Sequence, residues 1–248
     1  DFGADVLRVE NPSAVPTMKS VSAKEGEDFR DKNTLFLEFN RNKRGILMDV
    51  KTPKGMETLK RLVSISDVVI ENLNPQAVFK LGIPYEILKQ YNPTLIMVSV
   101  GGLGKKGAYG HWTTWGPNLL PFTGTTLLWN HSHLDHPVGT QLVHPDFFSG
   151  MLASTVLLAA IRHRSLTGEG QYFDYSQAEA ASNLIGPQLL DYSVNGRVPE
   201  PKGNSSELMG PHGIYRCIGE DSWVAIAVKN DDQWRKFKKV MGKQSKAH

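Results

Sequence analysis

Asp146 is the residue whose setting most invites chemistry, because it follows Pro145 and precedes a helix that the apolar spacing predicts over residues 146–164. An aspartate at the start of a helix usually caps it, since its oxygens accept backbone N–H bonds and its charge suits the positive end of the helix dipole. The small residues Ser149 and Gly150 would also let a bulky ligand approach this carboxylate, which could then attack an activated acyl group. From the residues alone, the capping role is favoured over the nucleophilic one.

A second cluster, over residues 130–136, reads Asn-His-Ser-His-Leu-Asp-His and contains the pattern H-x-H-x-D-H. This pattern resembles the metal-binding signature of metallo-β-lactamase-type hydrolases, in which imidazoles and a carboxylate hold two zinc ions. Those hydrolases place it after a β-rich half, whereas here it follows alternating strands and helices. A polar surface loop is therefore favoured, and a zinc-dependent hydrolase remains a distant alternative.

Basic side chains gather near the ends of predicted strands, in residues 40–44 and at Lys51 and Lys80. Ligands of open α/β sheets collect at the carboxyl ends of strands, and lysines there contact phosphates. Each cation is by default a solvated surface charge, but together they favour a phosphorylated ligand.

Trp112 and Trp115 lie in the irregular residues 105–140 and could either line a pocket for an acyl group or pack the loop.

The elements that must position these residues alternate along the chain. Apolar strands are predicted over residues 6–10, 45–50, 67–71, 95–100 and 171–175, with a polar loop over 11–33 and helices over 53–62, 118–126, 146–164 and 176–192. Strands that are apolar on both faces predict an α/β fold, with a Rossmann-like parallel sheet and flanking helices. We expect a large domain over residues 1–194, a linker over 195–210, and the start of a smaller α+β domain over 211–248.

The composition is that of an ordinary globular protein. The 248 residues carry 28 Lys and Arg against 25 Asp and Glu, a formal net charge of +3, and 40% are hydrophobic. This charge is too small to indicate nucleic-acid binding, and the single cysteine, Cys217, excludes an internal disulfide and a thiolate-rich zinc site. The apolar stretch over residues 150–161 is about half as long as a membrane span needs. No signal-peptide pattern opens the sequence, so we expect a cytoplasmic protein.

Several blocks of the sequence together resemble family III CoA-transferases. They are residues 1–6 and 9–10, 40–46 with Asp49 and Lys51, 67–72 with Pro75, 80–82, 92–96, 159–171, and 223–234. The resemblance spans essentially the whole chain. It implies a piece of a longer protein, which lacks the family's first strand and its C-terminal part.

The resemblance implies that Asp146 is the family's nucleophile, against the capping interpretation. In the family, an aspartate attacks the donor acyl-CoA to form a mixed anhydride, and the released CoA thiolate converts this to an aspartyl-CoA thioester. An acceptor carboxylate then attacks the thioester and leaves as the new acyl-CoA. The implied small-molecule partners are an acyl-CoA and a carboxylic acid. Coenzyme A is thus a substrate, with no permanently bound cofactor and no metal.

The same resemblance implies a binding site for CoA. Its implied contacts are Asp49, Val50, Lys51, Asn72, Leu73, Asn74 and Lys80, with the two lysines facing phosphates, and Thr113, Thr114 and Trp115 at the pantetheine end. Two positions depart from formyl-CoA transferases, because Asn11 replaces an arginine and Gly116 replaces a glutamate near the acyl group. These departures disfavour a formyl or oxalate substrate and favour a larger acyl group.

Other functions remain open at this point. α-Methylacyl-CoA racemases share the fold and are the second alternative, but they use a histidine base where this chain has Trp115, whose indole cannot take the proton. A non-catalytic CoA-binding module is a further alternative. The resemblance also implies an interlocked homodimer when the protein is full length, no nucleic-acid partner and no membrane span, and a mitochondrial or peroxisomal location if the source is eukaryotic.

Overall fold

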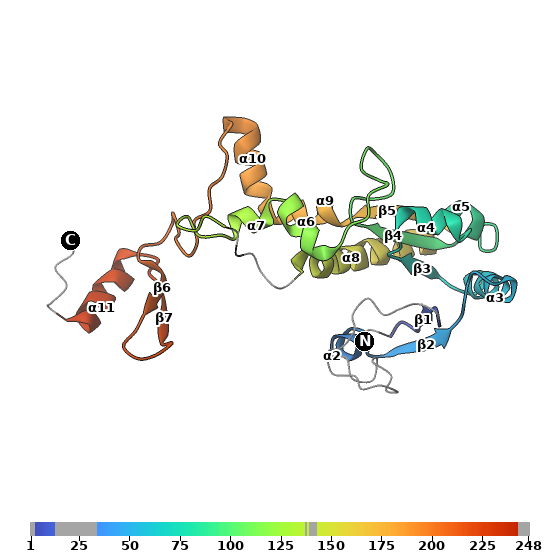
Figure 1. Cartoon of the computed structure of the whole chain (residues 1–248), viewed down its shortest axis with the longest axis horizontal. Coiled ribbons are helices and arrows are strands. Elements are labelled where there is room, and N and C mark those ends of the chain that lie inside the picture. Colours follow the sequence, from blue (N-terminus) through green and yellow to red (C-terminus); the bar gives the residue numbers. More distant parts are fainter. Residues whose placement is uncertain (1–2, 13–33, 137, 139–142, 243–248) are drawn as a thin grey trace. The chain divides into compact units, whose positions relative to one another are not determined.

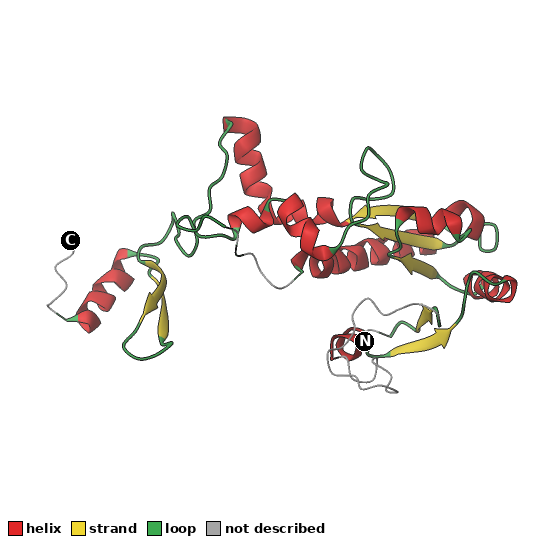
Figure 2. Ribbon diagram, viewed as in Figure 1, coloured by secondary structure: helices red, strands yellow, loops and turns green. Residues whose placement is uncertain are grey.

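The structure is a computed structural model that describes residues 3–12, 34–136, 138 and 143–242 (Figure 1). The chain divides into two compact units, of which the first comprises Asp1–Val98 and Leu157–Phe173 and the second Ser99–Val156 and Asp174–His248. Helices and strands alternate along the chain (Figure 2), and the parallel strands with helices between them confirm the predicted α/β class. From residue 13 onward, the loop predicted over residues 11–33 lies outside the described residues.

In the first unit, strands β1 (Val6–Glu10) and β2 (Lys43–Leu47) pair in parallel, with Val6 opposite Lys43 and Glu10 opposite Leu47. The sequence predicts β2 over residues 45–50, but the strand begins two residues earlier because backbone pairing with β1, and not apolar character, sets its ends. Helix α2 (Thr34–Phe39) precedes β2 and is not predicted by the sequence pattern.

Two capped turns follow strands of this unit. After β2, the Thr52 hydroxyl accepts the N–H of Gly55 at 3.1 Å, so helix α3 (Pro53–Ser64) begins where the sequence predicts. After β3 (Val68–Glu71), the Asn74 side chain accepts the N–H of Gln76 at 2.9 Å and caps α4 (Pro75–Lys80). Proline at the first helical position suits both starts, since its missing N–H would have no partner there. Apart from Lys80 at the end of α4, these turns carry the first unit's predicted CoA contacts.

The core lies around strand β4 (Ile96–Gly101), the middle strand of a sheet with the order β3-β4-β5, where β5 is Tyr172–Ser176. Every residue of β4 is buried, as its largely apolar sequence predicts, and this includes the polar Ser99. The buried cluster of the first unit combines residues of α3, α4, α5 (Tyr85–Leu88) and β4 with residues of the connections beside them: Val63, Val78, Ile83, Tyr85, Leu88, Leu95 and Met97. In the same unit, the Arg164 guanidinium lies 2.6 Å from the Asp67 carboxylate.

In the second unit, α6 (Gly116–Phe122) and α7 (Thr125–Leu128) replace the single helix predicted over residues 118–126. The chain breaks at Gly124, whose φ of +78° is the left-handed conformation that favours glycine. The break allows the chain to change direction before the histidine-rich residues 130–136.

Helix α8 (His144–Thr167) extends beyond the predicted 146–164 at both ends and passes from the second unit into the first. Among the residues that the structure describes, α8 is long and apolar enough, by length and composition, to cross a membrane. Core helices of soluble proteins pass the same test. Apolar side chains such as Met151 and Leu158 are exposed on α8.

After β5, the Ser176 hydroxyl accepts the N–H of Glu179 at 3.2 Å and caps α9 (Gln177–Ser182), as predicted. A short 3₁₀ turn, η1 (Asn183–Ile185), then separates α9 from α10 (Gly186–Asn195), so the single helix predicted over 176–192 is interrupted. The start of α9 has a direct part in the site described below.

Strands β6 (His212–Arg216) and β7 (Trp223–Ala227) form an antiparallel pair and are followed by α11 (Asp231–Met241), within the residues predicted to begin an α+β domain. Cys217 lies in the connection between the two strands and is exposed. The domain boundaries at residues 194 and 210 stay a prediction.

Candidate active site

Asp146 lies in the first turn of α8, two residues after the helix begins at His144. It is therefore inside the helix and not at the capping position that its sequence context favours. Its carboxylate oxygen Oδ1 accepts a hydrogen bond from the side-chain amide of Gln177, with 2.6 Å between Oδ1 and Nε2. Since Gln177 is the first residue of α9, this bond joins the starts of two helices.

Gly116, the first residue of α6, lies against the other carboxylate oxygen of Asp146. A Cβ atom at position 116 would lie 2.4 Å from Oδ2 of Asp146 and 1.9 Å from Cγ1 of Val143. Both distances are far inside normal contact, so only glycine fits while Asp146 keeps this orientation. The glycine that departs from formyl-CoA transferases is thus a direct neighbour of the predicted nucleophile.

The environment of Asp146 changes its acidity in two opposing ways. Partial burial of the carboxylate, the larger effect, raises the pKa of Asp146, and the hydrogen bond from Gln177 opposes this rise by stabilising the anion. The residue as a whole is nevertheless exposed. A carboxylate that has lost part of its hydration shell and can still be reached from outside is suited to nucleophilic attack.

Further polar groups near the start of α8 are buried. The ring of His144 stacks on Trp129, with ring centroids 5.0 Å apart, and its Nε2 atom is buried without a hydrogen-bond partner. The Ser149 hydroxyl, one turn after Asp146, is also buried and unpaired. A buried polar atom without a hydrogen bond lowers the stability of the folded state, so such atoms are rare in ordinary apolar cores. The first turns of α8 therefore differ from an ordinary core helix.

The predicted contacts Asp49, Val50 and Lys51 form the turn between β2 and α3. One Asp49 oxygen accepts the backbone N–H of Lys51 at 3.0 Å and lies 3.5 Å from the Asn11 amide nitrogen. The Lys51 side chain is exposed. The turn therefore fixes the carboxylate of Asp49 against its own backbone and directs the Lys51 cation to the surface.

The predicted contacts Asn72, Leu73 and Asn74 form the corresponding turn between β3 and α4. The N–H of Leu73 donates to the Glu71 carboxylate at 2.7 Å, and Asn74 serves as the helix cap. Lys80 is exposed in the last turn of α4. Thus the structure groups the seven first-unit contacts into two structured turns and one helix end.

Thr113, Thr114 and Trp115 lead directly into α6. A Cβ atom on Gly102 would lie 1.5 Å from the Thr114 hydroxyl oxygen, so Thr114 packs on the glycine turn after β4. The backbone N–H of Trp115 donates to the Asn118 side chain at 2.8 Å, and the indole is exposed. Because Trp115 precedes Gly116, it is the predicted contact that the chain brings next to Asp146.

The histidine-rich residues 130–136 do not converge on one point. The rings of His131 and His133 have centroids 5.5 Å apart, while His136 pairs with the adjacent Asp135 carboxylate at 2.8 Å. Within the described ranges, no three His, Cys, Asp or Glu side chains are grouped so that they could hold a metal ion.

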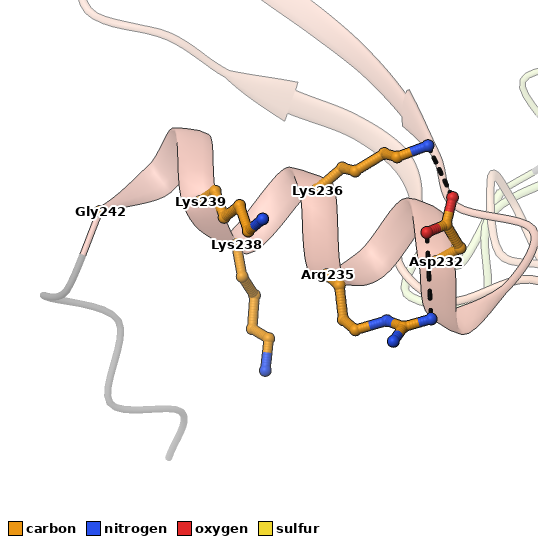
Figure 3. A pocket seen from close by; sticks show the side chains of 6 residues that line it. All are labelled: Asp232, Arg235, Lys236, Lys238, Lys239 and Gly242. Atoms are coloured by element: carbon orange, nitrogen blue, oxygen red, sulfur yellow. Dashed lines mark ion pairs between the residues drawn. The ribbon is translucent and has the colours of Figure 1, made fainter.

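Helix α11 carries a group of cations that sequence analysis does not single out. Arg235 and Lys236 both pair with Asp232, at 3.9 and 2.7 Å (Figure 3). Lys238 lies over the ring of Trp234. These side chains point outward from one helix and are exposed. Exposed pairs of this kind contribute little to stability, so the group is an ordinary charged helix face.

Gln177 is the hydrogen-bond partner of Asp146 that sequence reasoning misses. The signal in the sequence is weak: a glutamine follows the capping Ser176 and precedes alanines that are buried on the same helix. Its partner lies 31 residues earlier in the chain, and a contact at that distance cannot be read from local spacing.

Comparisons with known proteins place this geometry in context. The chain is 30% identical over 247 residues to a succinate–glutarate CoA-transferase of Agrobacterium fabrum, covering 98% of this chain and 60% of that protein. It is 28% identical to the alpha subunit of a succinyl-CoA–L-malate CoA-transferase of Chloroflexus aurantiacus, covering 97% of this chain and 56% of that subunit. The chain therefore spans about 60% of the length of these relatives.

Solved structures and family profiles agree with these relatives. A crystal structure of a CAIB/BAIF family protein from Brucella suis is similar, with a TM-score of 0.85 and 29% identity over 97% of this chain and 63% of that one. The profile described as CoA-transferase family III matches residues 1–248. The predicted resemblance is thereby confirmed, and the chain belongs to CoA-transferase family III.

Proposed function

We propose that the protein transfers CoA from an acyl-CoA donor to a free carboxylic acid, with Asp146 as the covalent carrier. The observation that carries this proposal is the setting of Asp146: an exposed residue whose carboxylate is partly desolvated at the start of α8, next to a glycine. The names of the relatives support CoA transfer as the activity class.

In the proposed reaction, the Asp146 carboxylate attacks the donor thioester carbon and expels CoA thiolate, which leaves a mixed anhydride. The thiolate then attacks the aspartyl carbon of the anhydride, releases the donor's carboxylate, and forms an aspartyl-CoA thioester. The acceptor carboxylate attacks this thioester, expels CoA thiolate and forms a second anhydride. Attack of the thiolate on the acceptor's acyl carbon finally releases the new acyl-CoA and restores Asp146. Each step conserves the energy of the thioester, provided that water is excluded.

We assign the CoA contacts to the same residues as the sequence resemblance does. The exposed cations of Lys51 and Lys80 would meet the phosphates, and the turns at Asp49 and Asn72 would meet the rest of the nucleotide. Trp115 and the threonines before it would border the pantetheine, which has to end at Asp146. The closeness of Trp115 to Gly116 supports this last assignment.

For the substrates, we propose a succinyl-CoA-type donor and a dicarboxylic acceptor of four or five carbons. The relatives' names mention succinate, glutarate and malate. Gly116 supports an acyl group larger than formyl, because this position provides no carboxylate of its own beside Asp146.

We further propose that the full-length protein is a cytoplasmic, interlocked homodimer. The exposed apolar side chains of α8, such as Met151 at 63% and Leu158 at 69% exposure, support a subunit that covers more surface when it is assembled. The mass of the full-length protein in solution tests this assembly, and a monomer at micromolar concentration would contradict it.

The test of the reaction is to trap the covalent intermediate. Full-length protein is incubated with succinyl-CoA and hydroxylamine, which should convert the acyl intermediate to a hydroxamate at Asp146, detectable by peptide mass. The Asp146→Asn variant should give no hydroxamate and no transfer, whereas Asp135→Asn, a change at an exposed aspartate, should behave like wild type. An unmodified Asp146 peptide would contradict the proposal. Exchange of an α-proton for deuterium without any acceptor acid would instead indicate a racemase.

A further inference from the structure

The side chain of Gln177 is a buried polar group, and its burial requires a compensating interaction. It is 6% exposed and lies at the start of a helix whose buried neighbours Ala178, Ala180 and Ala181 are small and apolar. Burying an amide is unfavourable unless it is hydrogen-bonded, and the bond of its Nε2 atom goes to Oδ1 of Asp146. The hydrogen bond to the Asp146 carboxylate is therefore the interaction that compensates for the burial of the Gln177 amide.

The two carboxylate oxygens of Asp146 have different neighbours. Oδ1 is engaged by Gln177 at 2.6 Å, while among the described residues no hydrogen bond reaches Oδ2, which lies against the backbone of Gly116. An oxygen whose lone pairs are already shared with a donor is the poorer nucleophile. Hence Oδ2 is the oxygen that is free to attack.

We infer that Gln177 is a catalytic residue that holds Oδ1 of Asp146, leaves Oδ2 to attack the thioester, and stabilises the oxyanion that later forms on Oδ1. The inference rests on the proposed function. Once Oδ2 is bonded to the acyl group, Oδ1 is the carbonyl oxygen on the aspartyl carbon. The Gln177 N–H is already directed at that oxygen and does not have to move.

The covalent steps show where this donor acts. When the CoA thiolate attacks the aspartyl carbon of the anhydride, the carbonyl electron pair moves onto Oδ1, and the tetrahedral intermediate collapses by expelling the donor's carboxylate. When the acceptor carboxylate attacks the aspartyl-CoA thioester, the same pair moves to Oδ1 again, and CoA thiolate leaves. A preorganised donor at a developing oxyanion typically accelerates such a step by about 10²–10³-fold.

The first step of the cycle differs. There the oxyanion develops on the donor's thioester oxygen and not on Asp146, so Gln177 contributes to it only by orienting the carboxylate. Carboxylates are also weaker nucleophiles than thiolates, so the step most dependent on Gln177 is the attack of the acceptor on the aspartyl-CoA thioester. Loss of the amide should therefore lengthen the lifetime of that thioester.

The test follows the charging and discharging of Asp146 in the full-length protein. With succinyl-CoA alone, wild type and Gln177→Met should both acquire CoA on Asp146, as seen by intact mass. On addition of succinate or glutarate, Gln177→Met should discharge about 10²–10³-fold more slowly, with the acceptor's KM changed little. Gln188→Met, a change at a partly buried glutamine of α10 in the same unit, should discharge like wild type.

A second variant separates catalysis from packing. Gln177→Glu keeps the shape, but its ionised carboxylate cannot donate and repels Asp146, so discharge should be slow at neutral pH. Discharge should recover as the pH falls, because protonation turns the introduced carboxyl group into a donor. A residue that acts only by packing would not produce this pH profile.

If wild type never acquires CoA on Asp146, the proposed function is wrong. If wild type is charged and Gln177→Met discharges at the wild-type rate, the inference alone is wrong.

Discussion

Replacement of Gly116 by alanine should damage the site through one methyl group. In the native geometry, the new Cβ would lie 1.9 Å from Cγ1 of Val143 and 2.4 Å from Oδ2 of Asp146, where normal contacts need about 3.4 Å or more. The methyl group thus has to displace at least one of the two side chains by an ångström or more. Overpacking of this kind costs about 1–3 kcal/mol of unfolding free energy. An ångström of misplacement of a nucleophile can cost about 10²-fold in rate.

The matched control is Gly186→Ala, at the first residue of α10. There a Cβ meets nothing within 4 Å, and the backbone is already helical. This change should be neutral or should raise the unfolding free energy by up to about 1 kcal/mol, because alanine has the higher helix propensity. Urea unfolding measures the stability of both variants, and hydroxamate formation at Asp146 measures the reaction. If Gly116→Ala is charged at the wild-type rate with unchanged stability, the close approach of Gly116 to Asp146 is refuted.

Two further predictions concern charge. Burial raises the pKa of Asp146, so the native state binds this proton more tightly than the unfolded state does, and the unfolding free energy falls as pH rises from about 4 through the native pKa. Asp146→Asn should therefore be more stable than wild type at neutral pH, as measured by chemical unfolding. The difference should be only a few tenths of a kcal/mol, roughly, because solvent screens the charge of an exposed residue, and it should vanish below about pH 3.5. Lys51→Ala should weaken CoA binding, measured by calorimetry, about 3- to 10-fold at low salt and less at high salt. The control change Lys54→Ala should leave CoA binding unchanged. Equal effects of the two changes would argue against a phosphate contact at position 51.

The elements that the sequence predicts correctly are those whose signals are local. Strand β4 is apolar except at Ser99 and is buried on both faces. Helix α3 begins at Pro53, where the sequence predicts. The role of Asp146 stays a prediction of the family resemblance, since its position in the sequence alone favours a cap.

The features that the sequence does not predict depend on pairing between distant segments. Strand β2 begins at Lys43 because it pairs with β1, although Lys43 and Arg44 are polar. The bond from Gln177 to Asp146 joins two helix starts 31 residues apart. The close approach of Gly116 to Oδ2 also exists only in three dimensions. Local patterns therefore predict most of the elements, and the family resemblance points to Asp146, whereas the groups around its carboxylate become visible only when the chain is folded.

The exposed thiol of Cys217, in the connection between β6 and β7, has a practical consequence for every labelling experiment on this protein. Thiols exchange with acyl-CoA thioesters without any enzyme, so Cys217 can collect an acyl group in the same incubation that modifies Asp146. Hydroxylamine would strip this adduct from the sulfur and restore the thiol, while the hydroxamate on the aspartate would persist. Digestion and sequencing of the two peptides therefore separate background chemistry from turnover, and a Cys217→Ser background removes the parallel reaction at its source.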